Sequence, residues 1–135
     1  MPLYQILPAH LPTMWPLVAP MLQKAVELES DVITIEHVEY QIRTGQMYLL
    51  AWEEPEVGIT GAATVKIVDH PMERVAHVTL MGGKGIVRTH VFAEAMNWMR
   101  SLGATKAECR TKGTLVGMYE KMGLENTHQI MQVKL

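Results

Sequence analysis

The stretch Met81-Gly82-Gly83-Lys84-Gly85-Ile86 lies between a segment that alternates like a β-strand and a segment with the apolar spacing of an α-helix. Glycines at such a junction let the backbone turn tightly and direct successive N–H groups outward, and the helix that follows adds the positive end of its dipole. The stretch therefore predicts either a phosphate-binding loop or a plain turn, because glycine also serves in turns that hold no ligand.

Length and composition bound the architecture around this stretch. The chain has 135 residues, of which 48% are hydrophobic, and no repeat or linker-like tract divides it, so a single domain over residues 1–135 is expected. No apolar run is long enough to span a bilayer, and the N-terminus lacks a basic segment followed by an apolar one. We therefore expect a cytoplasmic protein without a membrane span.

Cysteine and histidine usage gives no support for a metal centre or a disulfide. Cys109 is the single cysteine, so no internal disulfide can form, and the six histidines show no pair at metal-ligand spacing. No metal is predicted.

Charge is distributed unevenly although the formal net charge is only −2. Residues 1–60 carry eight acidic side chains against Lys24 and Arg43, whereas residues 82–112 hold six basic side chains against Glu94 and Glu108. The basic half contains the glycine stretch, which favours an anionic ligand there. A nucleic-acid partner is disfavoured because such domains are usually more basic overall.

Hydrophobic periodicity predicts the order β-α-α-β-β-β-α-β-α-β. Apolar spacing of about 3.6 residues predicts helices that begin after Thr13, Thr34 and near Val87, and a short one after Thr114. Alternation of apolar and polar residues predicts strands at 4–7, 46–52, 60–68, 74–81, 105–110 and 127–135. Short links between the second, third and fourth strands imply an antiparallel meander.

This order resembles the GNAT superfamily of N-acyltransferases. The glycine stretch opens the helix after the fourth strand, and Tyr119-Glu120-Lys121-Met122-Gly123-Leu124 precedes the last strand, as in that superfamily. The resemblance implies an α+β domain with a mixed, mostly antiparallel central sheet and helices on both faces. Small bacteriophage and prophage GNAT-like proteins are similar in Met14-Trp15-Pro16-Leu17-Val18 and in Trp98-Met99-Arg100-Ser101-Leu102-Gly103.

The resemblance implies a binding site for acetyl-CoA between the fourth and fifth strands. Pantetheine would pair with the fourth strand at Val78, Thr79 and Leu80. The pyrophosphate would meet the loop, with Lys84 and Arg88 as cationic donors. The implied loop residues are Met81, Gly82, Gly83, Lys84, Gly85, Ile86, Val87 and Arg88.

Three positions depart from the superfamily's pattern. Gly82 stands where an Arg or Gln is usual, Val87 where a Gly or Ala is usual, and Lys112 where an Asn commonly precedes the tyrosine. A β-branched side chain at the loop narrows the approach of backbone to phosphate, and a missing Arg or Gln removes contacts that order it.

Candidate catalytic residues follow from the resemblance and from the needs of acyl transfer to an amine. The resemblance implies that Tyr119 donates a proton to the departing thiolate; its position on an apolar helical stripe equally fits a packed aromatic. His77 is the candidate general base, with Glu108 as a second, while a surface histidine is the alternative interpretation. Cys109 is interpreted as a small buried thiol because no His–Asp arrangement accompanies it.

Two functions are therefore carried forward. The first is an N-acyltransferase in which an amine, on a small molecule or on a protein lysine or N-terminus, attacks acetyl-CoA directly. The alternative is a non-catalytic GNAT-fold phage protein that acts in virion structure or assembly or inhibits a host protein. A homodimer would fit either function.

Overall fold

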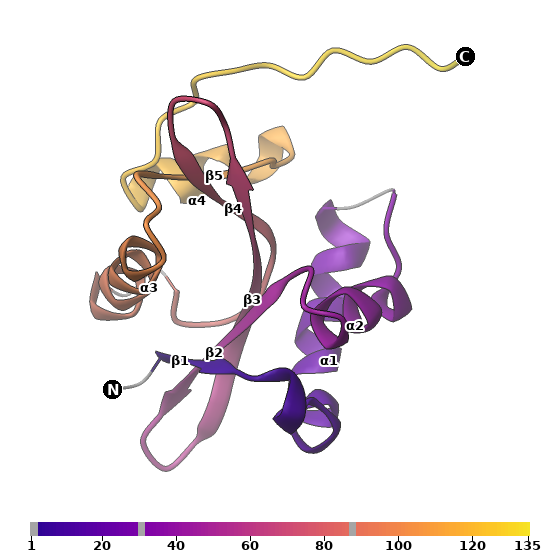
Figure 1. Cartoon of the computed structure of the whole chain (residues 1–135), viewed down its shortest axis with the longest axis vertical. Helices are drawn as coiled ribbons and strands as arrows, with labels where there is room; N and C mark the ends of the chain where they lie inside the picture. The colour runs from indigo at the N-terminus through magenta and orange to yellow at the C-terminus, as the bar shows by residue number, and fades with distance from the viewer. Residues whose placement is uncertain (1–2, 30–31, 87–88) are drawn as a thin grey trace.

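A five-stranded sheet forms the centre of the computed structural model, which describes residues 3–29, 32–86 and 89–135 (Figure 1). The strand order is β1-β2-β3-β4-β5; the first three neighbouring pairs are antiparallel and β4 pairs with β5 in parallel. The strands are β1 (Leu3–Ile6), β2 (Tyr48–Glu54), β3 (Gly58–Asp69), β4 (Arg74–Gly83) and β5 (Lys106–Cys109). The predicted α+β domain with a mixed, mostly antiparallel sheet is confirmed.

Helices cover both faces of this sheet, as predicted (Figure 1). They are α1 (Leu11–Glu29), α2 (Ile35–Arg43), α3 (Thr89–Ser101) and α4 (Val116–Lys121), with short 3-10 turns η1 (Pro8–His10) and η2 (Gly113–Leu115). In the described part of the chain, no helix is long and apolar enough to cross a membrane.

The sheet separates two hydrophobic clusters. One cluster joins α1 and α2 to one face and includes Val18, Leu22, Val38, Ile42 and Leu80. The other joins α3 to the opposite face and includes Leu50, Trp52, Val65, Val91 and Ala95. Strand residues alternate between the clusters because successive side chains of a strand point to opposite faces.

The first helix begins earlier than its sequence predicts. Thr13 was expected as the N-cap, but α1 starts at Leu11, directly after the η1 turn, so that expectation is wrong. Pro12, Pro16 and Pro20 are exposed and recur at intervals of four residues, so they share the solvent face of α1. Proline has no backbone N–H, so the carbonyls that would accept hydrogen bonds from these positions stay unpaired. Because the prolines lie on the solvent face, water can hydrate those carbonyls.

Two other helix starts test the predicted caps. Thr34 caps α2 as expected: its side chain accepts a hydrogen bond from the His37 N–H, and the His37 side chain reaches back to the Thr34 N–H. Thr114 does not cap α4, because it lies inside the η2 turn and the helix follows Leu115 without a side-chain cap. The predicted cap at Thr114 is therefore wrong.

The predicted last strand at 127–135 is not formed. Residues 125–135 belong to no helix or strand, and every one of them is exposed. Their alternation is typical of a strand, but a strand also needs a neighbouring edge to which its backbone can bind. The element order of the described chain therefore ends at α4.

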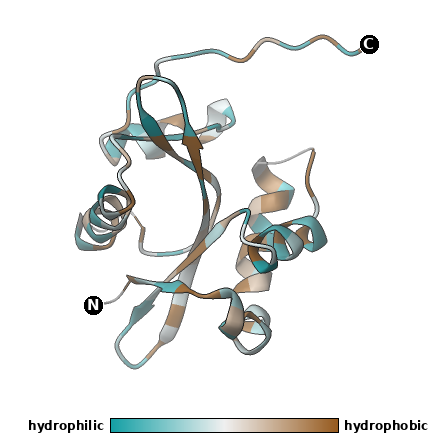
Figure 2. Ribbon diagram, viewed as in Figure 1, coloured by the Kyte–Doolittle hydropathy of each residue, from teal (hydrophilic) through white to brown (hydrophobic). Residues whose placement is uncertain are grey.

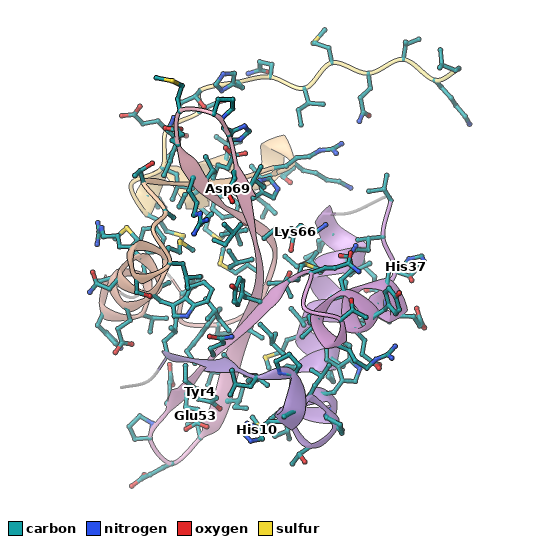
Figure 3. The ribbon with its side chains drawn as sticks, viewed as in Figure 1. Tyr4, His10, His37, Glu53, Lys66 and Asp69 are labelled. Carbon is teal, nitrogen blue, oxygen red and sulfur yellow. The ribbon has the colours of Figure 1, made fainter. Side chains whose placement is uncertain are left out.

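Tyr4 and Glu53 join the first two strands at the sheet's edge (Figure 3). The Tyr4 hydroxyl donates a 2.8 Å hydrogen bond to Glu53 Oε1. Partial burial, and then this hydrogen bond to an anion, raise the pKa of Tyr4 from 10.0 to about 12. The neutral phenol is thus favoured in the folded state.

Replacing Tyr4 with Phe should lower the free energy of unfolding at pH 7 by about 0.5–1 kcal/mol, because an exposed hydrogen bond is lost. The raised pKa of Tyr4 stabilises the fold fully below pH 10, the unfolded value, and this stabilisation disappears as pH rises toward 12. Urea unfolding of both proteins between pH 9 and about 12 measures the difference. Parallel pH profiles would contradict the assignment.

Candidate functional site

Strands β4 and β5 separate partway along the sheet. They pair from Val75 with Lys106 to Val78 with Cys109, where β5 ends, whereas β4 continues to Gly83. Over residues 79–83 the outer edge of β4 therefore has no neighbouring strand among the described residues. Backbone N–H and C=O groups at such an edge can pair with an extended ligand.

A β-bulge at Thr79 marks the point of separation. Thr64 pairs with Leu80 and Val65 with Val78, so Thr79 is an extra residue on β4. Its hydroxyl donates to the Thr64 carbonyl at 3.2 Å and lies 3.1 Å from the sulfur of Met47. The bulge is therefore held by contacts with β3 and with Met47, the residue that precedes β2.

The bulge changes which side chains share a face. The sequence places Ala76, Val78 and Leu80 on one face by simple alternation. Val78 packs with the α3 cluster, but Leu80 packs with the α1–α2 cluster, so that expectation is wrong for Leu80. The extra residue shifts the alternation by one position. Val78 and Leu80 therefore point to opposite faces of the sheet where β4 separates from β5.

An apolar cavity opens between β4 and β5 on the α3 face. Counting its open mouth, the cavity has a volume of about 570 Å³. Its lining comes from β4 (Val78 and Met81), β5 (107–109), α3 and α4, and from residues of β1, β2 and β3 beneath them. The part of this space that a water-sized group can occupy is only about 50 Å³, so the opening between the separated strands takes at most a slender, largely apolar group.

Tyr119 forms part of the wall of this cavity. The residue lies on α4 and only 7% of its surface is exposed. The Leu124 N–H donates to the Tyr119 carbonyl at 3.1 Å, which fixes the end of α4 beside the cavity. Glu108 and Cys109 of β5 line the same cavity, so three of the residues considered from sequence lie together.

His77 lies on β4 one residue before Val78, the last residue paired with β5, and does not line this cavity. Its Nδ1 is 3.1 Å from Glu108 Oε2, across the parallel pair of β4 and β5. The His77 side chain is 28% exposed and that of Glu108 is 52% exposed. The structure thus joins the two candidate bases into one pair.

The glycine stretch packs closely against neighbouring elements and also forms a turn. Gly82 and Gly83 are the last residues of β4, which extends two residues beyond its predicted end at 81. A Cβ at Gly82 would meet the Met21 carbonyl of α1, and one at Gly83 would meet the Thr60 carbonyl of β3. The glycines therefore let α1 and β3 approach β4 closely, whatever else the loop binds.

The side chain of Trp52 also fixes the loop. Trp52 Nε1 donates a 2.5 Å hydrogen bond to the Lys84 carbonyl, and the Lys84 N–H donates to Thr60 at 2.9 Å. Gly83 and Gly85 have φ values of 90° and 91°, which favour glycine. Val87 and Arg88, the last two predicted loop residues, lie outside the described residues.

A second cavity lies on the opposite face, between α2 and the sheet. Counting its open mouth it has a volume of about 910 Å³, and its lining includes His37, Gln41, Lys66 and Thr79. Figure 3 shows His37 and Lys66 on the α2 side of the sheet. Because Val78 lines the first cavity and Thr79 the second, the two cavities flank β4 at the bulge.

Gln41 gives this second cavity an unused acceptor. Its side-chain Oε1 is buried and has no hydrogen-bond partner in the described part of the chain. A buried amide oxygen without a partner is costly, and an N–H or O–H of a ligand would satisfy it. Sequence analysis missed this residue; its position beside Ile42 and one turn after Val38, at the border of the buried stripe of α2, is the signal that would have found it.

Metal-ligand side chains do not gather in threes: among the residues that the structure describes, no group of three or more His, Cys, Asp or Glu is arranged to hold an ion.

No protein-family model and no curated protein matches the sequence. Solved structures do match. An aminoglycoside acetyltransferase from an uncultured soil metagenomic sample, in complex with sisomicin, has a TM-score of 0.70 at 9% identity, covering 98% of this chain and 93% of that one. Glucosamine-6-phosphate N-acetyltransferase from Arabidopsis thaliana has a TM-score of 0.64 at 16% identity, covering 98% and 96%.

A third likeness extends over both chains in full. Ribosomal-protein-alanine N-acetyltransferase from Brucella melitensis has a TM-score of 0.70 at 9% identity and is covered completely, as is this chain. At these identities the likeness concerns the fold. The protein has the fold of the GNAT acetyltransferases, as its element order predicts.

Proposed function

We propose that the protein is an N-acyltransferase that transfers the acetyl group of acetyl-CoA to an amine. The observation that carries the proposal is the separation of β4 and β5 after Val78 and Cys109, with a cavity at the opening whose wall contains Tyr119. The shared fold of named acetyltransferases supports it. Fold alone does not establish activity, so the proposal rests on the site.

The residues at the opening fit the shape of acetyl-CoA. The unpaired outer edge of β4 at 79–83 offers backbone groups to the amides of pantetheine, and the apolar cavity accepts its acyl end. In this proposal the pyrophosphate lies at the turn formed by Gly83 and Gly85, with the Lys84 side chain as its cationic partner. The cosubstrate supplies an acetyl group already activated as a thioester.

Rate enhancement in this proposal comes mainly from positioning. The β4 edge holds the acetyl carbonyl beside the bulge, where backbone N–H groups polarise its oxygen as negative charge develops. Tyr119 donates its phenolic proton to the sulfur as the C–S bond breaks and the N–C bond forms. The buried position of Tyr119 keeps water from competing for that proton.

His77 and Glu108 form the base of the proposal. In the tautomer that donates Nδ1–H to Glu108, the Nε2 lone pair of His77 can accept a proton. His77 lines neither cavity, so the proton released by the attacking amine reaches it through water.

The acceptor amine is proposed to occupy the second cavity. Its N–H donors would satisfy Gln41 Oε1, and Thr79 at the bulge lies between this cavity and the acetyl group. Lys66 lines the cavity, and none of the lining residues that the structure describes is acidic. An amine with neutral or anionic substituents therefore fits better than a polycation, despite the acidic N-terminal half of the chain.

The second candidate, a non-catalytic GNAT-fold protein, is compatible with one specific observation, although the comparisons do not favour it. Gly82 packs against α1 and Gly83 against β3, which accounts for both glycines without a phosphate. The experiment below separates the two candidates.

In calorimetric titration, acetyl-CoA should bind with micromolar affinity. Desulfo-CoA should bind as well, whereas ATP should bind only weakly. Ala107 is exposed on β5 and lines the first cavity, so Ala107→Trp fills the mouth without disturbing the core. This variant should weaken acetyl-CoA binding at least about tenfold, or 1.4 kcal/mol.

Val57→Trp, an exposed position in the turn between β2 and β3, is the matched control and should bind as the wild type does. No heat from acetyl-CoA at millimolar concentration would refute the enzyme and favour the second candidate. Equal affinity in the Ala107→Trp variant would move the binding site away from this cavity.

A further inference from the structure

The second cavity, between α2 and the sheet, combines three kinds of chemistry in its lining. It holds a cation in Lys66, a buried acceptor in Gln41 and an apolar wall. Each comes from a different part of the chain: Lys66 from β3, Gln41 from α2, and much of the wall from the segment before α2. The ligand that fits this cavity best is one that matches all three.

Lys66 brings a positive charge to the cavity. Val65 packs with the α3 cluster, so Lys66, the next residue of β3, faces the α2 side of the sheet (Figure 3). Among the residues that the structure describes, Lys66 makes no ion pair. Its cross-strand neighbour His77 already contacts Glu108. A carboxylate on a ligand would therefore meet a cation that these residues leave unneutralised.

Gln41 is fixed at the end of α2 by its main chain. Its carbonyl accepts hydrogen bonds from the Gln46 N–H at 2.7 Å and from the Met47 N–H at 3.1 Å. Its side-chain Oε1 is the buried acceptor without a partner in the described part of the chain. Only a donor can satisfy this oxygen, and the amine that the proposed reaction requires is such a donor.

Much of the remaining wall is apolar. Val32, Ile33, Tyr40 and Met47 line the cavity, and Figure 2 shows hydrophobic residues in the segment that leads into α2. Val32 is 82% exposed and Met47 is 4% exposed, so the wall extends from the surface to the core. An apolar side chain of a ligand that lies along this wall leaves water, which favours binding.

We propose that the second cavity binds an α-amino acid with an apolar side chain, whose α-amine is the acetyl acceptor. The carboxylate pairs with Lys66, the amine donates to Gln41 Oε1, and the side chain lies along the apolar wall. The inference rests on the proposed acetyl transfer and names the class of its acceptor. An amine without a carboxylate leaves Lys66 unneutralised, which disfavours simple amines and polyamines.

Acetyl transfer to this acceptor needs no further reactant. The α-ammonium releases a proton through water to His77, and the neutral amine then attacks the acetyl carbon. The N–C bond forms as the C–S bond breaks, and the proton of Tyr119 goes to the departing sulfur. The products are an N-acetyl amino acid and CoA. The carboxylate takes part in no bond that changes, so Lys66 determines specificity and is not a catalytic residue.

Three ligands of similar shape test the assignment. L-leucine carries all three groups, isoamylamine lacks only the carboxylate, and isocaproate lacks only the amine. In NMR titrations of the protein alone, L-leucine should bind at least about tenfold more tightly than either analogue, because each analogue lacks one charged hydrogen-bonding group.

Substitutions then assign each group of the ligand to a residue. Lys66→Met removes the charge and keeps the length, so L-leucine should bind no better than isoamylamine, whose own affinity should be unchanged. Gln41→Met should abolish the difference between L-leucine and isocaproate in the same way. Lys66→Arg should keep the preference for L-leucine. Lys24→Met, at an exposed position of α1, is the matched control and should behave as the wild type does.

Equal affinity of the wild type for L-leucine and isoamylamine would overturn the proposal, as would a difference that survives in Lys66→Met. Absence of saturable L-leucine binding at millimolar concentration would overturn it too. Mass spectrometry after addition of acetyl-CoA tests the transfer separately. If L-leucine binds as expected and no N-acetyl-leucine forms, the proposed function fails while the amino-acid site stands.

Discussion

Replacing Tyr119 with Phe should lower kcat for acetyl transfer by about 10²- to 10⁴-fold, the usual contribution of a positioned general acid. The substitution removes one hydroxyl from a side chain that is 7% exposed and keeps the ring that packs beside the cavity. Acetyl-CoA affinity should therefore change little. Steady-state kinetics with an accepted amine, found by mass spectrometry of acetylated products, measures the effect.

Measuring kcat and acetyl-CoA affinity separately distinguishes a Tyr119 that acts as a general acid from a Tyr119 that only packs. If Tyr119 served only in packing, Tyr119→Phe would leave kcat within a few-fold of the wild type, and any loss would follow the melting temperature. Tyr48→Phe is the matched control, because Tyr48 packs edge-on against Trp98 at 5.3 Å and lines neither cavity. An equal loss of kcat in both variants would contradict the catalytic role.

The fold could be predicted from the sequence because its main signals are local. Thr34 and Gly45 bound α2 as expected, and the period-two alternation of the central segments gave three antiparallel strands. The failures involve long-range contacts. The segment at 127–135 has the pattern of a strand, yet a pattern cannot show whether an edge is there to receive it.

The site was predictable only in part for the same reason. Tyr119, Glu108 and Cys109 were singled out from sequence and line one cavity, because the β5–α4 unit that carries them is local. The bulge at Thr79 depends on the pairing between β3 and β4, and no residue type in the sequence predicts it. Trp52 is buried, and its hydrogen bond to the Lys84 carbonyl joins residues 32 apart in the chain, a pairing that no local pattern predicts.

Replacing Gly82 with Ala should strongly destabilise the fold. A Cβ at Gly82 would meet the carbonyl oxygen and carbon of Met21, which are backbone atoms of α1 and cannot rotate away. Gly82 also pairs with the fully buried Ala62 of β3, so the helix lies on two small residues. Gly82→Ala must push α1 off the sheet, at a cost of about 2–3 kcal/mol or more.

Thermal and urea unfolding measure this cost, which corresponds to a fall of roughly 10 °C in melting temperature for a domain of this size. Gly117→Ala is the matched control: Gly117 lies in α4 with nothing within 4 Å of its built Cβ, so alanine there should leave stability unchanged or raise it slightly. The comparison also distinguishes a packing role of Gly82 from a phosphate-binding role. If Gly82 is required for phosphate and not for packing, Gly82→Ala will melt like Gly117→Ala and lose only acetyl-CoA affinity. Because the introduced Cβ would meet backbone atoms of Met21, we expect the loss of stability in the protein alone, before any ligand is added.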